Sequence, residues 1–434
     1  MGLIKRQEGL GVKRKATKFQ IDLNLSNIKI KRCVVDEAGS YHLHVACTAT
    51  SSDCTQCGQK ITCSHGQCQE SIIEHVPILE KRVFIHVNWP RFICKDCGVT
   101  VSFRPDWLNK TGAMSLACEN AVLKNLINST IKDVSEKTGL TEEIVEGIVN
   151  RRVETNYDWS QVSVKAIGLD EIALRKGHQQ YLTIITDISV LGAIQIITVI
   201  DGRKKEDIMP FLQSIPSEVL LNLESICVDM SSSYVPALKE RINNDNFFNQ
   251  VVTIDRFHVA KLVGKKVDKE RINLVKKLKK ELEGDQESLE KIKGTMWPFR
   301  HHAHDLNEDQ SQKLQELFKH SAPLKELYDL RESLYTIFEN ETLTKETAKI
   351  EIDAWIEKSN KHESFVSFIK TYRNFEDIIL NYFTHRRSSG PVEGINNKLK
   401  VIKRRGYGFR NVFNFMKRMI LDINYRSQLL GLAT

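Results

Sequence analysis

The chain has 434 residues, of which 63 are Lys or Arg and 55 are Asp or Glu, so its formal net charge is +8. Hydrophobic residues make up 41% and charged residues 27%, a balance that excludes a fully disordered or fibrous protein. At roughly 100 to 200 residues per domain, this length predicts about three domains. The longest charge-free apolar stretch, residues 188–200, is shorter than the ~20 residues of a membrane-spanning helix, so we expect no membrane contact.

The amino terminus and the cysteines indicate a compartment. Residues 1–20 contain basic residues but no apolar run of the length that a secretory signal requires, so we expect an intracellular protein. Ten cysteines in this chain are too few for a disulfide scaffold, and an intracellular compartment keeps thiols reduced. Paired thiols here therefore indicate metal binding.

Four kinds of segment follow one another along the chain. Short apolar runs alternate with polar residues over 1–50, which predicts strands of a small sheet. Apolar residues at helical spacing over 116–154, interrupted by Gly139, predict a short helix, a turn and a second helix. Five β-branched runs within 164–260 predict an α/β sheet, and the charged residues 261–383 predict an all-helical block.

The cysteine-rich segment predicts a zinc site. Its two C-x2-C pairs, each followed by a glycine, are formed by Cys54, Cys57, Cys94 and Cys97. Four thiolates at such spacings can close a tetrahedral zinc site, and the filling of all four positions by protein favours a structural ion over a catalytic one. The alternative is reduced thiols in a small core. Cys63, His65 and Cys68 lie within reach and can replace one pair or bind a second ion.

Residues 131–149 fit a helix, a glycine turn and a second helix capped by Thr141. In a DNA-reading unit of this kind the start of the second helix enters the major groove. Glu142, Glu143 and Glu146 would then face phosphates, although these acids suit the positive end of the helix dipole. A plain helical linker or a dimer contact remains the alternative.

Three acids form the candidate catalytic set. Asp170 and Asp229 each follow a strand-like apolar run, and carboxylates at strand ends of an α/β sheet lie where a crevice opens. Glu393 lies in a helix predicted from Pro391 through Lys403. Three such carboxylates can hold two divalent ions that polarise a phosphodiester; the alternative is that they are solvated caps. Glu171, Asp187 and Asp201 are weaker candidates in similar settings.

Basic residues are concentrated in one segment, 385–410, which has eight of them and a single acid. Interleaved with Tyr407 and Phe409, this charge suits phosphate contacts with some stacking; the alternative is a solvated helix face. The basic residues are Arg386, Arg387, Lys398, Lys400, Lys403, Arg404, Arg405 and Arg410.

A second group combines Trp297 with His301, His302 and His304. Asp305 is the one acid at ligand spacing in the sequence. We therefore favour a loop near DNA or a satisfied core over a metal site for these histidines.

The motifs GLDEIAL, CVDMSSSY, DRFHVAKL and SSGPVEGINNKLKVIKRRGYGFRN together resemble the ISL-three-type insertion-sequence transposases of bacteria. The resemblance extends from the cysteine cluster through the last helix. It implies that Asp170, Asp229 and Glu393 are the metal-binding catalytic acids and that Asp255 and His258 support the site. By resemblance to other transposases with helical insertions, Trp297 can stack on an unpaired base, but we favour core packing for it.

The resemblance also implies the architecture: a ribonuclease-H-like mixed α/β sheet with a large all-helical insertion, preceded by a small zinc-binding β domain and a helix-turn-helix segment. The expected segments are a zinc-binding domain at 1–110, a helix-turn-helix at 111–160, the first part of the catalytic core at 161–260, the insertion at 261–384, and the last part of the core at 385–434.

The predicted function is a DNA transposase that binds the inverted-repeat ends of an insertion sequence, hydrolyses phosphodiesters and joins the freed 3′ hydroxyl to target DNA. We expect Mg²⁺ or Mn²⁺ at the three acids and structural Zn²⁺ at the four cysteines. The expected partners are double-stranded DNA and a second copy of the chain, since two ends must meet, in the bacterial cytoplasm at the nucleoid. The alternatives are a zinc-containing DNA-binding regulator with an inactive transposase-like fold, and a nuclease without strand joining.

Overall fold

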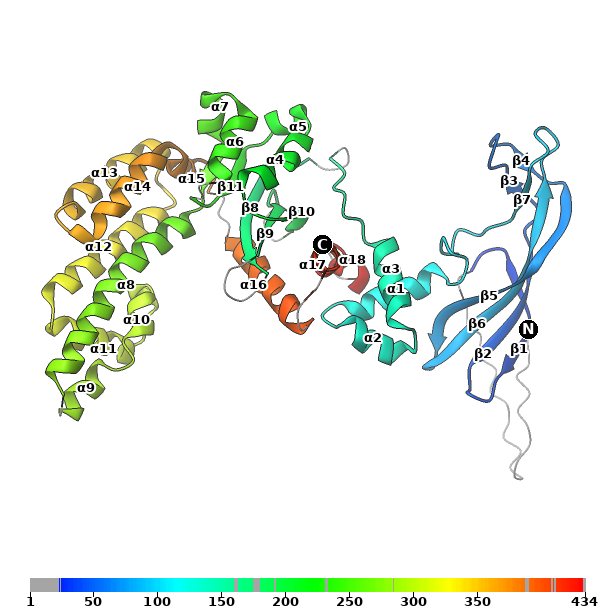
Figure 1. Cartoon of the computed structure of the whole chain (residues 1–434), viewed down its shortest axis with the longest axis horizontal. Helices are drawn as coiled ribbons and strands as arrows, with labels where there is room; N and C mark the ends of the chain where they lie inside the picture. The colour runs from blue at the N-terminus through cyan, green and yellow to red at the C-terminus, as the bar shows by residue number, and fades with distance from the viewer. Residues whose placement is uncertain are drawn as a thin grey trace. The chain divides into compact units, whose positions relative to one another are not determined.

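The computed structural model describes residues 23, 25–159, 163–174, 180–190, 193–230, 233–283, 285–386, 390–406, 409 and 411–431, with only the backbone described at 289 and 390–393. The described residues fall into two compact units, one within Met1–Arg152 and Tyr425–Ala433 and the other within Val153–Asn424 (Figure 1). The predicted five-segment division is finer than these two units and stays a prediction.

The first unit contains the predicted small sheet. Its strands follow the order β1-β2-β6-β5, with β7 paired to the far end of β6, and a separate two-stranded ribbon joins β3 to β4. One face carries the core residues Leu43, Ile73 and Ile85, each at most 6% exposed. The strands are β1 (Ile28–Val35), β2 (Tyr41–Cys47), β3 (Ser52–Asp53), β4 (Lys60–Ile61), β5 (Ser64–Ile78), β6 (Lys81–Ile93) and β7 (Thr100–Ser102).

Helices α1 (Leu116–Leu126), α2 (Ile131–Thr138) and α3 (Glu142–Arg152) follow this sheet. The predicted turn is confirmed, since Gly139 ends α2 in the left-handed conformation at φ 70°. The sequence prediction of one helix before that turn is wrong. Asn128, at φ 60°, and a capping box at Thr130 divide that segment into α1 and α2.

A buried carboxylate holds α3 against α1. Glu119 on α1 is 1% exposed and accepts hydrogen bonds from Arg151 (2.7 Å) and Arg152 (3.1 Å) at the end of α3. Burial by itself would raise the pKa of Glu119, but hydrogen bonds from Arg151, Asn109 and Arg152 outweigh it and leave this pKa below its usual value. The ion pairs thus fix α3 against α1.

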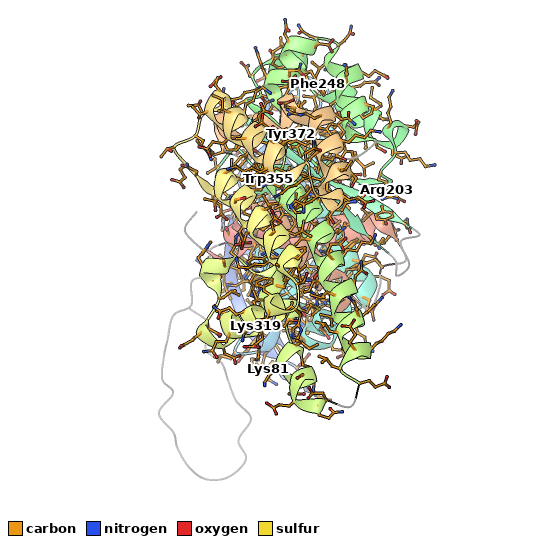
Figure 2. All side chains as sticks on the ribbon, turned by 90° about the vertical axis from the view of Figure 1, so that its left-hand side faces the viewer. Lys81, Arg203, Phe248, Lys319, Trp355 and Tyr372 are labelled. Carbon is orange, nitrogen blue, oxygen red and sulfur yellow. The ribbon has the colours of Figure 1, made fainter. Side chains whose placement is uncertain are left out.

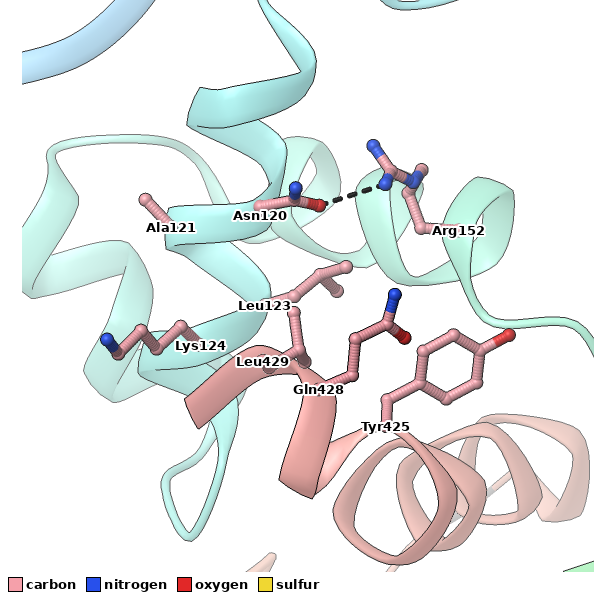
Figure 3. Close-up of a pocket in the computed structure, with 8 residues that line it drawn as sticks. All are labelled: Asn120, Ala121, Leu123, Lys124, Arg152, Tyr425, Gln428 and Leu429. Carbon is pink, nitrogen blue, oxygen red and sulfur yellow. Dashed lines mark hydrogen bonds between the residues drawn. The ribbon is translucent and has the colours of Figure 1, made fainter. Parts of the chain in front are cut away.

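A small pocket lies where the short helix α18 (Arg426–Leu430) meets α1. Figure 3 shows Arg152 donating to Asn120 at its rim, at 2.9 Å. The pocket is lined by Asn120, Ala121, Leu123, Lys124, Arg152, Tyr425, Gln428 and Leu429. The last helix of the chain therefore belongs with the amino-terminal helices.

The second unit is built on a five-stranded sheet, as the five β-branched runs predict. Its order is β10-β9-β8-β11-β12; β8 pairs antiparallel with β9, whereas β8, β11 and β12 run parallel. The mixed α/β class predicted from sequence is therefore confirmed. The strands are β8 (Ala166–Ala173), β9 (Tyr181–Asp187), β10 (Gln195–Asp201), β11 (Ser225–Val228) and β12 (Val252–Ile254).

Helices cover this sheet, and the last of them in this unit packs against strand β10. Asn424 exchanges two hydrogen bonds with the backbone of Ile196, at 2.8 and 2.9 Å, which fixes the last helix of this unit on strand β10. These helices are α4 (Lys205–Ser214), α5 (Ser217–Leu221), α6 (Tyr234–Ile242), α7 (Asp245–Val251), α16 (Gly390–Arg405) and α17 (Val412–Asn424).

The predicted all-helical block is confirmed and begins directly after β12. Trp355 and Tyr372, labelled in Figure 2, are 3% and 1% exposed among its helices. Asn381 donates to the backbone carbonyl of Val252 at 2.6 Å, which anchors the block to the sheet. Its helices are α8 (Arg256–Glu281), α9 (Gln286–Ile292), α10 (Met296–Arg300), a 3-10 turn (Ala303–Asp305), α11 (Glu308–Lys319), α12 (Ala322–Glu339), α13 (Lys345–Ser359), α14 (Glu363–Leu380) and α15 (Tyr382–His385). Within the described residues, no helix has both the length and the apolar character needed to cross a membrane.

Candidate active site

The four predicted zinc ligands come together. Cys54 Sγ lies 3.4 Å from Cys97 Sγ, and Cys57 Sγ lies 3.7 Å from Cys94 Sγ and 3.9 Å from Cys97 Sγ. Zn–S bonds of ~2.3 Å in tetrahedral geometry place sulfurs roughly 3.8 Å apart. The spacing of these thiols therefore fits one zinc ion.

Both cysteine pairs fold in the same way, for a reason visible in the sequence. Gly58 and Gly98 adopt φ values of 73° and 72°, which a glycine accepts without strain. Their N–H groups donate to the carbonyls of Cys54 and Cys94, which closes each turn. Backbone N–H groups of Cys57 and Gln56 lower the pKa of Cys54 to about 6. The turn therefore favours the thiolate form of Cys54, while the hydrogen bonds of Cys57 and Cys97 to the neighbouring sulfurs raise the pKa of those two thiols.

Of the alternative ligands, Cys68 contacts a residue outside the four-cysteine cluster. Its thiol contacts the hydroxyl of Ser102 at 3.2 Å. Among the described residues, the cysteine group able to hold an ion consists of the four predicted ligands, without Cys63, His65 or Cys68.

The candidate acids of the second unit lie in one row across three strands. Cys227 on β11 pairs with Gly168 on β8, and Val228 pairs with Ile254 on β12. Continuing these parallel registers by one or two positions sets Asp229 beside both Asp170 and Asp255. A hydrogen bond of 3.1 Å from Asp255 N to the Val228 carbonyl supports that continuation. Neighbouring strands are ~4.8 Å apart, so the three acids lie at one level of the sheet. Asp229 directly follows its strand as predicted, whereas Asp170 lies within β8, which continues to Ala173 along β9.

The electrostatics show that these acids share one environment. Burial raises the pKa of Asp170, and the charges of Asp255 and Glu171 raise it further, while the Glu171 N–H and His258 oppose the shift. Tyr234 responds to the same charges: burial raises its pKa, and the negative charges of Asp229, Glu171 and Asp170 add to that effect. Such a concentration of carboxylates in a partly buried site favours a bound cation.

Helix α16 reaches this row from 226 positions further along the chain. The side-chain amide of Asn396 donates to Asp170 Oδ2, and Asn396 is 4% exposed. Glu393 lies three positions earlier in the same helix, a spacing that brings two positions to one face. Its side chain lies outside the described part of the structure. The backbone of Glu393, the predicted third acid, therefore lies one helical turn from Asn396, which is hydrogen-bonded to Asp170.

Asp255 and His258 sit where β12 becomes α8. Asp255 is 1% exposed and caps α8 by accepting from the Phe257 N–H at 3.2 Å. Three positions later, His258 is close enough to Asp170 for its charge to lower the pKa of that acid. The geometry thus brings Asp170, Asp255 and His258 together, and the roles of all these residues stay predictions.

Comparison with known proteins gives the family. A transposase model, that of the ISL3 (ISL-three) group, matches residues 167–419, more than half of the 434-residue chain. The chain belongs to the ISL3 transposase family. A second model, described as the zinc-finger of transposase IS204/IS1001/IS1096/IS1165, matches residues 51–97, the range that contains the four cysteines. ISL3 membership makes the chain a DNA-cleaving and DNA-joining enzyme with a structural zinc ribbon.

Two insertion-sequence proteins show the extent of the similarity. The transposase for insertion sequence element IS1001 of Bordetella parapertussis is 26% identical over 87% of this chain and 90% of its own length. The transposase for insertion sequence element IS1557 of Mycobacterium tuberculosis is 23% identical over 76% of both chains. The ISL3 resemblance read from the motifs is therefore confirmed.

The predicted DNA-binding residues of the ISL3 chain separate into two sets. Lys400, Arg404 and Arg405 are exposed on α16. Arg386, Lys398 and Lys403 instead donate to backbone carbonyls, for example Lys403 to Ala173 at 2.7 Å. Arg387 and Arg410 lie outside the described residues. The first set thus lies at the surface of α16, where phosphates can reach it.

The Trp297 group lies in the helical block of the ISL3 chain. Trp297 is 60% exposed, so the core packing that we favoured from the sequence is wrong. His302 lies 3.6 Å from Glu339 and 3.9 Å from Glu332 on α12. Sequence spacing alone did not reveal these acids, because the fold brings them from more than 25 positions away.

Of the weaker acid candidates, Asp187 accepts from the Tyr157 hydroxyl at 3.0 Å and from Ser189. Glu171 pairs with Arg203 at 3.1 Å, and Asp201 accepts from Gln180. Each has a structural partner. Asn396, by contrast, was not singled out from the sequence. Its position one helical turn after Glu393 is the signal that could have identified it.

Proposed function

We propose that this ISL3 transposase binds the inverted-repeat ends of an insertion sequence, hydrolyses phosphodiesters there and joins the freed 3′ hydroxyl to target DNA. Asp170, Asp229 and Glu393 are the acids assigned to metal binding. The observation that carries the proposal is the row of carboxylates on neighbouring strands, Asp170 within β8 and Asp229 directly after β11. Helix α16 contacts this row through the hydrogen bond from Asn396 to Asp170.

The donor set suits Mg²⁺ or Mn²⁺, which prefer carboxylate oxygens. A partly buried Asp170 whose pKa is raised by burial and by neighbouring acids is a group that a divalent cation would restore to its charged form. Two such ions, when bound, supply polarisation of the phosphodiester, an activated water and stabilisation of the leaving oxygen.

The chain's own residues would hold this arrangement in place. Asn396 orients Asp170 through its amide, and Asp255 fixes the start of α8 and so the position of His258. The strand order β10-β9-β8-β11-β12, antiparallel on one side of β8 and parallel on the other, supports the ribonuclease-H-like fold implied by the family. The block from α8 to α15 is then an insertion in that fold.

DNA contacts are assigned to the exposed cations of α16 and to Trp297. Lys400, Arg404 and Arg405 follow the proposed third acid on the same helix, so they would gather phosphates next to the place of cleavage. Helix α3 is the proposed reading helix of the helix-turn-helix unit, with a helical linker as the alternative. Because two ends must meet, we expect a homodimer or larger assembly.

The test uses the intact chain with Mg²⁺ or Mn²⁺ and duplex DNA from the borders of its own gene. Glu393→Gln removes one carboxylate charge at nearly constant size. We expect it to abolish nicking while DNA retention on a gel stays close to wild type. A wild type that nicks no border sequence would favour the inactive regulator, and nicking without joined products would favour a nuclease.

A further inference from the structure

Three histidines share the outer face of the amino-terminal sheet, opposite its core. Strands β2 and β6 pair in parallel, and their register sets His44 beside His86 and His42 beside Phe84. Residues that alternate with them, such as Leu43 and Ile85, are buried in the core. Strand β5, on the other side of β6, adds Glu70 near the same place.

The ligand atoms of His44, Glu70 and His86 lie within 4.8 Å of one another. Glu70 Oε2 is 3.4 Å from His86 Nδ1, and the two imidazole rings are stacked with centroids 4.5 Å apart. Ligands bound to zinc at ~2.0 to 2.1 Å in tetrahedral geometry lie roughly 3.3 Å apart. This cluster therefore has nearly the spacing of a metal site.

A buried nitrogen of His86 points to the same conclusion. The side chain of His86 is 11% exposed, and its Nδ1 makes no hydrogen bond to any residue that the structure describes. A buried polar atom of this kind ordinarily has a partner. Nδ1 is the atom that faces Glu70, so an ion between them would satisfy it.

The other nitrogen of His86 is held by a relay. His86 Nε2 lies 2.9 Å from His42 Nδ1, and His42 Nε2 lies 3.3 Å from Asp36 Oδ2. One proton arrangement suits the whole chain of contacts: His86 donates from Nε2 to His42, and His42 donates from Nε2 to Asp36. Nδ1 of His86 is then an acceptor. Metal-bound histidines are usually oriented in this way by a second partner.

The charges nearby leave a net preference for a cation. Asp36 and Glu70 carry two negative charges, and Arg32, set opposite His44 by the β1–β2 register, carries one positive charge.

The cluster is also separate from the zinc ribbon. His86 precedes Cys94 by eight positions, most of them in strand β6, which corresponds to about 25 Å at ~3.3 Å per residue.

We propose that His44, His86 and Glu70 bind a second divalent transition-metal ion of the zinc type, with His42 and Asp36 orienting His86. Two imidazoles and a carboxylate are typical ligands for such ions. The ion would join β2, β5 and β6 on the outer face of the sheet. Three protein ligands leave one position for water or for a group from another molecule. The proposal does not depend on the transposase activity.

Cobalt distinguishes the two sites in the intact chain. Untagged protein is stripped of metal under reducing conditions and titrated with Co²⁺ while its absorbance is recorded. Cobalt bound by four thiolates gives strong near-ultraviolet charge-transfer bands, whereas cobalt bound by imidazole and carboxylate gives only weak visible bands. We expect two ions per chain, one of each kind.

Variants assign the second ion. His44→Ala and Glu70→Gln should each remove the weak bands and lower the stoichiometry from two ions to one. Their thiolate bands should persist, which shows that the zinc ribbon is still folded. Glu80→Gln makes the same charge change at an exposed position of the same hairpin and should retain both ions. His302→Ala removes the other histidine group and should do the same.

Several results would overturn the proposal. One is a wild-type chain that binds a single ion with thiolate bands. Another is a second ion that survives both His44→Ala and Glu70→Gln, or one that is lost in His302→Ala. If a variant lost both ions through misfolding, X-ray absorption of the wild type loaded with two zinc ions decides: an average shell of sulfur alone contradicts the site, and added nitrogen and oxygen ligands support it.

Discussion

The contact between Asn396 and Asp170 makes the most specific prediction about catalysis. Asn396→Ala removes a hydrogen bond to a carboxylate, and such bonds contribute about 1.5 to 3 kcal/mol. At ~1.4 kcal/mol per factor of ten, the variant should cleave DNA roughly 10- to 100-fold more slowly. The same range is usual when the orienting partner of a metal ligand is lost.

The assay is the initial rate of nicking of border DNA against Mn²⁺ concentration and pH. Losing the amide donor raises the pKa of Asp170 above its already elevated value, and metal binding needs the ionised carboxylate. The half-saturating Mn²⁺ concentration should therefore rise, and the acidic limb of the pH profile should move to higher pH. DNA retention should not change.

Asn397→Ala is the matched control. This neighbour in the same motif is exposed and contacts Lys400 at 3.4 Å, so its loss should change the rate less than about twofold, in line with surface substitutions. Equal rates for Asn396→Ala and wild type, or an unchanged Mn²⁺ dependence, would refute the reasoning.

Three further predictions concern stability, pH and salt. Glu119→Gln breaks a buried ion-pair cluster with Arg151 and Arg152, which should cost about 3 kcal/mol and appear as faster hydrogen exchange in α1 to α3 at pH 7; unchanged protection would contradict it. Because the pKa of Glu119 is lowered on folding, its contribution is present above the unfolded pKa and lost as pH falls through the folded pKa, so wild type and variant should converge in acid. Asp170→Asn should raise the unfolding temperature of the metal-free chain, since the raised pKa of Asp170 means that its charge opposes folding above the unfolded pKa; a lower temperature would count against a buried, charge-crowded site. Arg404→Ala with Arg405→Ala should weaken DNA binding and flatten its salt dependence by ~2 units of log–log slope, and an unchanged slope would show that α16 does not contact phosphates.

Local patterns were enough to predict most elements of this chain. The five β-branched runs became β8 to β12, and the two Cys-x2-Cys-Gly turns closed as expected, because both depend on residues within a few positions of one another. The break at Asn128 was missed because apolar spacing continues through it. Only the left-handed backbone at that residue and the cap at Thr130 reveal it.

Contacts between distant segments were not predictable in the same way. The strand-end position predicted for Asp229 is confirmed, because β11 ends at Val228. The same prediction for Asp170 is wrong: the apolar residues after it continue β8 to Ala173, paired with β9. Asn396 reaches Asp170 across 226 positions, and no sequence pattern gives a distance over such a span. The histidine cluster on β2 and β6 was missed because a parallel pairing of these strands was not anticipated.

Asp170, Asp229 and Glu393 are proposed to bind the catalytic ions together. The most direct measurement is the anomalous diffraction of Mn²⁺ in crystals of the intact transposase. We expect density between Asp170 on β8, Asp229 directly after β11 and the Glu393 side chain of α16. Manganese bound elsewhere, or bound by the two aspartates with Glu393 turned away, would contradict it.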